Sequence, residues 1–165
     1  MEMGLSNRLL SIWYSKKWLK SLPQIKFDKR RFQQVLLNLL TNATKYQSQG
    51  QIKIRVSLLD DSAMGNEHWI QVGVQDQGVG MTPEQIQNIF TPFSQVNHRG
   101  DICGNGVGLS ICKMICEHLD GTLSVDSQVG EGSLFIFTMK FHYVVVQSSQ
   151  LNVISERTIE SSNTL

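Results

Sequence analysis

The longest regular pattern in the chain is a helical one, over residues 31–46. Apolar residues recur there every three or four positions and predict one buried stripe: Phe32, Val35, Leu36, Leu39, Leu40 and Ala43. The opposite side carries polar side chains one turn apart: Arg31, Gln34, Asn38, Asn42 and Lys45. Carboxamide oxygens can complete the coordination of a magnesium ion that already holds phosphate oxygens. A solvated face would look the same, so this pattern alone leaves both interpretations open.

A second pattern predicts a half-buried strand that ends beside two glycines. Apolar residues alternate over 70–74, and Asp76, Gly78 and Gly80 follow. A carboxylate at a strand end can accept a hydrogen bond from a ligand amine, and glycine lets the backbone approach a flat ring closely. The alternative is a simple turn in which Asp76 bonds its own backbone.

A third segment, Gly104-Asn105-Gly106-Val107-Gly108-Leu109, leads into a helix that we expect to end near Leu119. Amide N–H groups at a helix N-terminus bind anionic phosphate without the help of side chains. Such a run is weak support on its own, because flexible loops look alike. The segment lacks the preceding strand of a dinucleotide-binding fold and the lysine of a P-loop, so those two folds fit poorly.

The remaining elements follow from turn and cap residues. Residues 5–20 place leucine and tryptophan among basic residues, and we interpret them as the tail of a preceding helix. Thr82-Pro83-Glu84 is typical of a helix start. Residues 94–103 are expected to form a loop, and the chain from about 147 is expected to be disordered. Strands are expected at 24–27, 51–59, 122–127 and 133–141.

Composition narrows the class of protein. The chain has 165 residues, 41% of them hydrophobic, and a net charge of +1, which predicts one domain with a hydrophobic core. Near-neutral charge favours neither nucleic acid nor an anionic membrane as a partner. No apolar stretch of about 18 residues occurs, so we expect no direct membrane contact and a cytoplasmic location. Three cysteines without zinc-site spacing are interpreted as reduced thiols (Cys103, Cys112 and Cys116).

The order of the motifs identifies a family. The chain resembles the catalytic, ATP-binding domain of protein histidine kinases, within the superfamily that includes gyrase, mismatch-repair and chaperone ATPases. The resemblance covers about Phe27 to Phe141. It rests on five segments in order: Asn38 to Tyr46, Asp76 to Gly80, Phe90-Thr91-Pro92-Phe93, Gly104 to Leu109, and Gly130-Glu131-Gly132-Ser133. The fold it implies is an α/β two-layer sandwich, in which about three helices cover one face of a mixed β-sheet beside a mobile ATP lid.

The resemblance also implies roles for the matching residues. Asn42 would ligate magnesium, with Asn38 nearby, and Lys45 would neutralise phosphate charge, so these three form the catalytic set. Asp76 would receive the adenine amino group, with Gly80 against the ring. The implied ATP-binding set is Asn38, Asn42, Lys45, Tyr46, Asp76, Gly78, Gly80, Phe93, Gly104, Gly106, Val107, Gly108, Leu109 and Ser133. The aromatic pair Phe90 and Phe93 would pack at the root of the lid. Ser133 stands where the family usually has threonine and keeps the hydroxyl.

One position separates the members of this superfamily. Relatives that hydrolyse ATP carry a glutamate where this chain has Asn38, and that glutamate activates water as a general base. A carboxamide has no lone pair of useful basicity, so Asn38 cannot take that part. Histidine-kinase members share the asparagine, because an imidazole nucleophile needs little activation. The resemblance therefore favours a histidine kinase over an ATPase.

The phosphate acceptor is expected on another domain. None of the four histidines lies in the sequence context of a phosphoacceptor: His68, His98, His118 and His142. We therefore expect transfer of the ATP γ-phosphoryl group to a histidine-bearing dimerisation and phosphotransfer domain, with a response-regulator receiver domain downstream. The alternative is a non-catalytic nucleotide-binding or regulatory module of the same fold. The expected organisation is a connecting segment (1–26), the ATP-binding domain (27–142) and a disordered tail (143–165).

Overall fold

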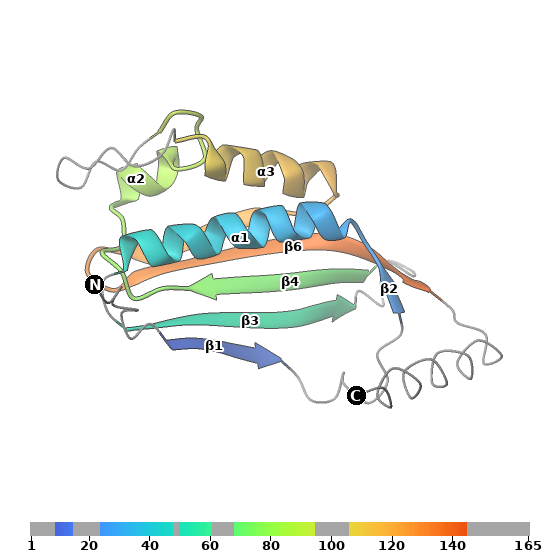
Figure 1. Ribbon diagram of the computed structural model, residues 1–165. Coiled ribbons are helices and arrows are strands. Elements are labelled where there is room, and N and C mark those ends of the chain that lie inside the picture. Colours follow the sequence, from blue (N-terminus) through green and yellow to red (C-terminus); the bar gives the residue numbers. More distant parts are fainter. Residues whose placement is uncertain (1–8, 15–23, 48–49, 61–67, 95–105, 145–165) are drawn as a thin grey trace, which may run out of the picture.

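The computed structural model describes residues 9–14, 24–47, 50–60, 68–94 and 106–144 (Figure 1). Alternating strand patterns and one long amphipathic pattern give rise to the elements of this part of the chain. In chain order they are β1 (Leu9–Tyr14), β2 (Gln24–Lys26), α1 (Lys29–Tyr46), β3 (Gln51–Asp60), β4 (His68–Gln75), α2 (Pro83–Asn88), α3 (Gly108–His118), β5 (Leu123–Gln128) and β6 (Gly132–Val144).

The described strands form one six-stranded mixed sheet in the order β1-β3-β4-β6-β2, with β5 also paired to β6. Only β1 and β3 run parallel, and every other neighbouring pair is antiparallel. The long strand β6 pairs with β4 over residues 134–141, with β5 over 132–137 and with β2 over 142–144. The expected strands at 24–27, 51–59, 122–127 and 133–141 are thereby confirmed to within a few residues.

The three described helices, α1, α2 and α3, lie on one face of the sheet, so this part of the chain has two layers (Figure 1). Alternate strand residues point toward the helices and form one core with the apolar stripe of α1. Fully or nearly buried members of that core are Val35, Leu39, Ala43, Ile52, Ile54, Val72, Val74, Met81, Cys112, Ile115, Cys116, Leu123, Phe135, Phe137 and Met139. The stripe predicted on α1 and the alternation predicted in β4 are both confirmed. The α/β two-layer sandwich is confirmed with them.

Local hydrogen bonds fix where the helices begin. The Asp28 carboxylate accepts from the Arg31 N–H at 3.0 Å and caps α1. At α2, the Gln85 N–H donates to the Thr82 hydroxyl and the Gln85 side chain accepts from the Thr82 N–H, which is a capping box. Pro83 occupies the first turn of α2, where the N–H that proline lacks would have no helical partner. The helix start predicted at Thr82 is confirmed.

One predicted element is wrong. We expected residues 5–20 to be the tail of a helix, but residues 9–14 form β1, whose register pairs Leu9 with Gln51 and Tyr14 with Val56. Residues 9–14 include isoleucine, tryptophan and tyrosine, which favour strands. It also lies along the otherwise unpaired edge of β3, and pairing satisfies the backbone groups of that edge. The expected lid at 94–103, apart from residue 94, and the expected tail from 147 lie outside the described residues.

None of the helices in the described part of the chain is both long enough and apolar enough to span a lipid bilayer.

Candidate functional site

The polar face of α1 places Asn38 and Asn42 one turn apart, both half-buried. The Asn42 Nδ2 group donates to Asn38 Oδ1 at 3.3 Å. That bond occupies the amide nitrogen of Asn42 and the amide oxygen of Asn38, and it leaves the Asn42 oxygen and the Asn38 nitrogen for other partners. A neutral oxygen acceptor beside an N–H donor suits a hard cation that carries phosphate oxygens. The donor set of these two residues therefore fits magnesium bound to a nucleotide.

The start of α3 lies directly against this pair. A Cβ atom at Gly108 would lie 2.6 Å from Asn38 Nδ2, so a larger residue there would displace the Asn38 side chain. The N-cap residue of α3, Val107, makes no side-chain hydrogen bond to the first amide N–H groups of that helix. These N–H groups and the Asn38 amide together form a donor-rich surface at the positive end of a helix dipole.

Asp76 lies just past the end of β4 and is only 5% exposed. Its Oδ1 atom accepts from the Gly78 N–H at 2.8 Å and from the Ser133 N–H at 3.3 Å. The Asp76 N–H donates to the Ser133 carbonyl at 2.9 Å. With Oδ1 engaged twice by the backbone, Oδ2 is the atom of this carboxylate that a ligand amine could reach. The main chain of Ser133 thus holds Asp76 in place, and the Ser133 hydroxyl lies 3.0 Å from that of Ser127.

Burial raises the pKa of the Asp76 carboxyl above its usual 3.8, and the backbone hydrogen bonds from Gly78 and Ser133 partly oppose that shift. The native state therefore binds more protons than the unfolded state between the two pKa values. Stability of the nucleotide-free protein should accordingly rise as the pH falls from above the folded pKa toward 3.8. Asp76→Asn should lack this contribution, because its amide does not ionise.

Urea unfolding of both proteins from neutral to acidic pH measures the difference. The Asp76→Asn protein should gain stability relative to wild type at neutral pH, and the gain should shrink in acid. A gain that grows as the pH falls would mean that the folded-state pKa of Asp76 is lowered instead.

Close glycine contacts join this loop to its neighbours. A Cβ atom at Gly78 would lie 2.6 Å from the Tyr46 carbonyl oxygen, at the end of α1. A Cβ atom at Gly132 would overlap the Asp76 carbonyl, and one at Gly80 would overlap the Gln128 carbonyl. The end of α1, the loop after β4 and the β5–β6 turn are therefore packed backbone to backbone.

The aromatic residues at 90 and 93 behave differently from each other. Phe90 is partly buried against the core, as expected, with Lys113 Nζ 5.3 Å from its ring centroid. The packing expected for Phe93 is wrong, because its side chain is 77% exposed. The Phe93 backbone takes a positive φ of 63° and its N–H donates to the Gly106 carbonyl at 3.0 Å. That bond joins the two described ends that flank residues 95–105, which is a main-chain role.

Lys45 and Tyr46 complete the polar end of α1. The Lys45 ammonium lies 3.1 Å from the Tyr46 hydroxyl and 4.8 Å from the centroid of its ring. Tyr46 is 36% exposed. The pair thus presents a cation and an aromatic surface beside the Gly78 loop.

Most of the predicted site residues therefore meet through direct contacts: Asn38 with Asn42 and Gly108, Tyr46 with Gly78, Asp76 with Ser133, and Phe93 with Gly106. Gly104 lies outside the described residues. Val107 and Leu109 flank Gly108 at the start of α3. Sequence reasoning missed Gln47, which is buried beside the Asp76 loop. Position 47 continues the buried series 35, 39 and 43, so a polar residue on an apolar stripe was the available signal.

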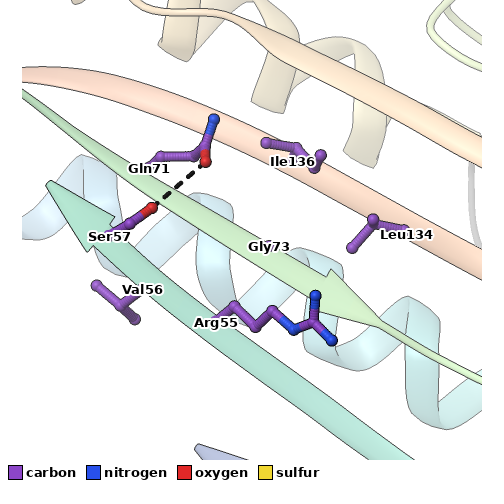
Figure 2. Close-up of a pocket in the computed structure, with 7 residues that line it drawn as sticks. All are labelled: Arg55, Val56, Ser57, Gln71, Gly73, Leu134 and Ile136. Atoms are coloured by element: carbon purple, nitrogen blue, oxygen red, sulfur yellow. Dashed lines mark hydrogen bonds between the residues drawn. The ribbon is translucent and has the colours of Figure 1, made fainter. Parts of the chain in front are cut away.

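A separate hollow of about 390 Å³ lies on the sheet face opposite the described helices (Figure 2). Gly73 forms its floor, and half-buried Leu134 and Ile136 stand along β6. None of the predicted site residues lines it. The described residues also contain no group of three or more His, Cys, Asp or Glu side chains that could hold a metal ion. A metal at the site above would therefore depend on amide and phosphate oxygens.

Comparison with known families gives one match over most of the chain. The family of histidine kinase-, DNA gyrase B-, and HSP90-like ATPases matches residues 27–143. Among curated proteins, the chain is similar to the peroxide stress-activated histidine kinase mak2 of Schizosaccharomyces pombe, with 36% identity over 127 residues. It is also similar to the sensor protein EvgS of Escherichia coli K12, with 38% identity over 117 residues. The matches cover 74% and 70% of this chain but only 6% and 9% of those proteins.

Two solved structures share the fold. Full-length ShkA in complex with AMPPNP aligns with a TM-score of 0.69 and 27% identity, over 86% of this chain and 27% of that one. The nucleotide-free catalytic domain of the histidine kinase ThkA aligns with a TM-score of 0.58 and 28% identity, over 81% of this chain and 79% of that one. The resemblance therefore extends over about four fifths of an isolated catalytic domain.

Proposed function

Because the chain belongs to the family of histidine kinase-, DNA gyrase B- and HSP90-like ATPases, we propose that it binds ATP and transfers the γ-phosphoryl group to a histidine on a separate helical domain. The proposal rests mainly on the contacts between segments that are far apart in the sequence and that carry the motifs. The carboxamide pair of α1 touches the start of α3, and the end of α1 touches the loop that holds Asp76. Phosphate-binding and base-binding groups thus belong to one continuous set of contacts.

The proposed roles follow from the atoms left available. Asp76 Oδ2 accepts from the amino group of adenine, and Gly80 lets the ring approach the backbone. The Asn38 nitrogen and the first N–H groups of α3 donate to phosphate oxygens. Asn42 Oδ1 ligates magnesium, which neutralises phosphate charge when it is bound. Lys45 adds a positive charge at the same end of α1, and Tyr46 adds an aromatic surface.

The reaction is an in-line displacement at the γ-phosphorus. A ring nitrogen of the acceptor histidine forms the new N–P bond, the bond to the bridging oxygen breaks, and ADP leaves with that electron pair. The histidine loses the proton on its other ring nitrogen after transfer. Because imidazole needs little activation, Asn38 does not have to act as a base, and most of the rate enhancement comes from positioning and charge stabilisation.

We also propose the setting of this domain. Its ATP-binding motifs lie within residues 27–142, whereas β1, β2 and the end of β6 extend its sheet beyond those bounds. The domain takes its acceptor histidine from a dimerisation and phosphotransfer domain and passes the phosphoryl group on to a receiver domain. The proposed location is the cytoplasm. Burial raises the pKa of the Cys112 thiol to about 11 and that of the Cys116 thiol to about 12. Both thiols stay protonated at neutral pH and unreactive toward oxidation.

Mixing the chain with a histidine-bearing helical hairpin and γ-labelled ATP tests the proposal. The expected result is acid-labile, alkali-stable label on the hairpin, and none when its histidine is replaced by alanine. Tight ATP binding without transfer to any hairpin would favour the alternative, a non-catalytic nucleotide-binding module. Rapid phosphate release without an acceptor would favour an ATPase instead.

The assignment of the base-binding residue makes a separate prediction. Asp76→Asn presents an amide to the base in place of one acceptor oxygen, so the preference for ATP over GTP should fall by about tenfold or more, as expected when a buried hydrogen bond to a charged group is lost. Competition of both nucleotides against a fluorescent ATP analogue measures this ratio. Asp126→Asn, an exposed carboxylate on β5, is the matched control and should leave the ratio unchanged. An unchanged ratio in Asp76→Asn would remove Asp76 from the base-binding site.

A further inference from the structure

Gln47 is a buried amide at the junction of the helix layer and the Asp76 loop. It is only 1% exposed and forms the C-cap of α1, where its backbone N–H donates to the Ala43 carbonyl at 3.1 Å. Its side-chain oxygen Oε1 accepts from the Gln77 N–H at 2.7 Å. An amide at a position that extends the apolar stripe of α1 is costly to bury unless it is hydrogen-bonded.

The loop after β4 is fixed by three successive backbone N–H groups. The Asp76 N–H donates to the Ser133 carbonyl on β6, the Gln77 N–H to Gln47 on α1, and the Gly78 N–H back to the Asp76 carboxylate. Gln47 is therefore the side chain through which α1 holds the residue that follows Asp76. Loss of that bond leaves the position of the carboxylate to its contacts with Ser133 and Gly78 alone.

The other end of the Gln47 side chain is unsatisfied. Among the buried side-chain nitrogen and oxygen atoms of the described residues, Gln47 Nε2 has no hydrogen-bond partner. A buried donor without an acceptor destabilises the protein, so such a group in a native structure requires an explanation, and an acceptor on a bound ligand or an ordered water is one. The unsatisfied donor lies on a side chain that already contacts the proposed base-binding loop.

We propose that Gln47 is a positioning residue for purine recognition: it holds Asp76 in place through the Gln77 N–H, and its Nε2 group acquires an acceptor when an adenine nucleotide binds. This inference rests on the proposed function of the site. The acceptor is a lone pair on the base itself or on a water that accompanies it, and either source satisfies the same donor.

Two substitutions separate the two atoms of the amide. Gln47→Met has a similar length but removes both the acceptor and the unsatisfied donor, whereas Gln47→Glu keeps an oxygen acceptor for the Gln77 N–H. We expect Gln47→Met to weaken ATP binding by about tenfold and to lower the preference for ATP over GTP. Gln47→Glu keeps the acceptor for the Gln77 N–H but has no donor at the position of Nε2, so it should lose part of that preference, and less of it than Gln47→Met loses. Melting temperatures without nucleotide report whether each variant folds.

Gln77→Ala is the matched control. It removes the bond from the Gln51 N–H to the Gln77 side chain but leaves the backbone N–H that Gln47 holds. Its ATP affinity and its base preference should equal those of wild type. If Gln77→Ala loses the preference as Gln47→Met does, general loosening of the loop accounts for both, and the inference is overturned.

NMR of the Gln47 side-chain amide in the wild-type protein tests the inference without any substitution. The side-chain amide resonances of Gln47 should shift when ATP is added and shift less with CTP, which lacks the purine ring. If the wild type binds ATP without such a shift, the inference is overturned and the proposed function stays intact. The same holds if a folded Gln47→Met protein keeps the wild-type preference for ATP over GTP. Failure of the wild type to bind ATP at all overturns both.

Discussion

Asn42→Ala should lower phosphoryl transfer to a histidine-bearing hairpin by about 100-fold or more, because it removes the proposed protein ligand of magnesium. Replacing groups that merely support a metal ligand already costs about 10- to 100-fold in affinity or activity. Mg-ATP at ~100 times its dissociation constant should stabilise the wild-type fold by about 2.7 kcal/mol. The variant should lose most of that stabilisation, which thermal melting with and without Mg-ATP measures.

The nucleotide-free variant should remain nearly as stable as wild type. Asn42 is half-buried, and its side chain makes one hydrogen bond, to the neighbouring Asn38 amide. Thr41→Ala is the control, because the exposed Thr41 hydroxyl bonds only the Leu37 carbonyl of its own helix. The Thr41→Ala protein should retain phosphoryl transfer to the hairpin and the full shift of its melting temperature with Mg-ATP. If Asn42→Ala also keeps the full shift, Asn42 is not a ligand.

Gly80→Ala should destabilise the fold by roughly 4 kcal/mol, which is large for a single methyl group. Gly80 has a φ of +66°, which an L side chain adopts at a cost, and its Cβ would overlap the Gln128 carbonyl. The Val129 Cα atom lies 3.0 Å from the same point. Since both obstacles are backbone, a side-chain rotation cannot relieve the overlap, and the loop must move away from the β5–β6 turn.

Gly130→Ala separates backbone strain from steric overlap. Gly130 also has a positive φ, of +83°, but no atom lies within 4 Å of its Cβ position. Gly130→Ala should lower the free energy of unfolding by only about 1–2 kcal/mol, because it adds left-handed backbone strain without steric overlap. Urea unfolding of the two variants gives the comparison. Equal costs would mean that the loop and the turn are not packed together as described.

The parts of the fold that depend on periodicity could be predicted from sequence. The stripe over Val35, Leu39 and Ala43 and the alternation at Val72 and Val74 are buried as expected, since each face of an amphipathic element has one favourable environment. Strand β1 could not be predicted in this way. Its pairing with β3 is a long-range contact, and a short apolar run of residues is compatible with either a helix or a strand.

The sequence predicted which residues belong to the candidate site, but not which of their atoms make the contacts. The contact of Gly108 with Asn38 is consistent with the order of the motifs, whereas the hydrogen bond from the Ser133 N–H to Asp76 depends on the register of β6 beside the Asp76 loop. Phe93 was expected to pack as an aromatic residue. Its positive φ directs an exposed ring away from the core while its N–H bonds Gly106. No local pattern of apolar residues encodes such a backbone conformation.

A crystal structure of the chain with magnesium and AMPPNP tests most directly whether the carboxamides of Asn38 and Asn42 and the carboxylate of Asp76 bind the same nucleotide. Magnesium should lie about 2.1 Å from Asn42 Oδ1, and the adenine amino group should lie about 3 Å from Asp76 Oδ2. The start of α3 should face the phosphates. A nucleotide bound in the hollow beside Gly73, or anywhere that leaves Asn42 and Asp76 without contact to it, would contradict the account.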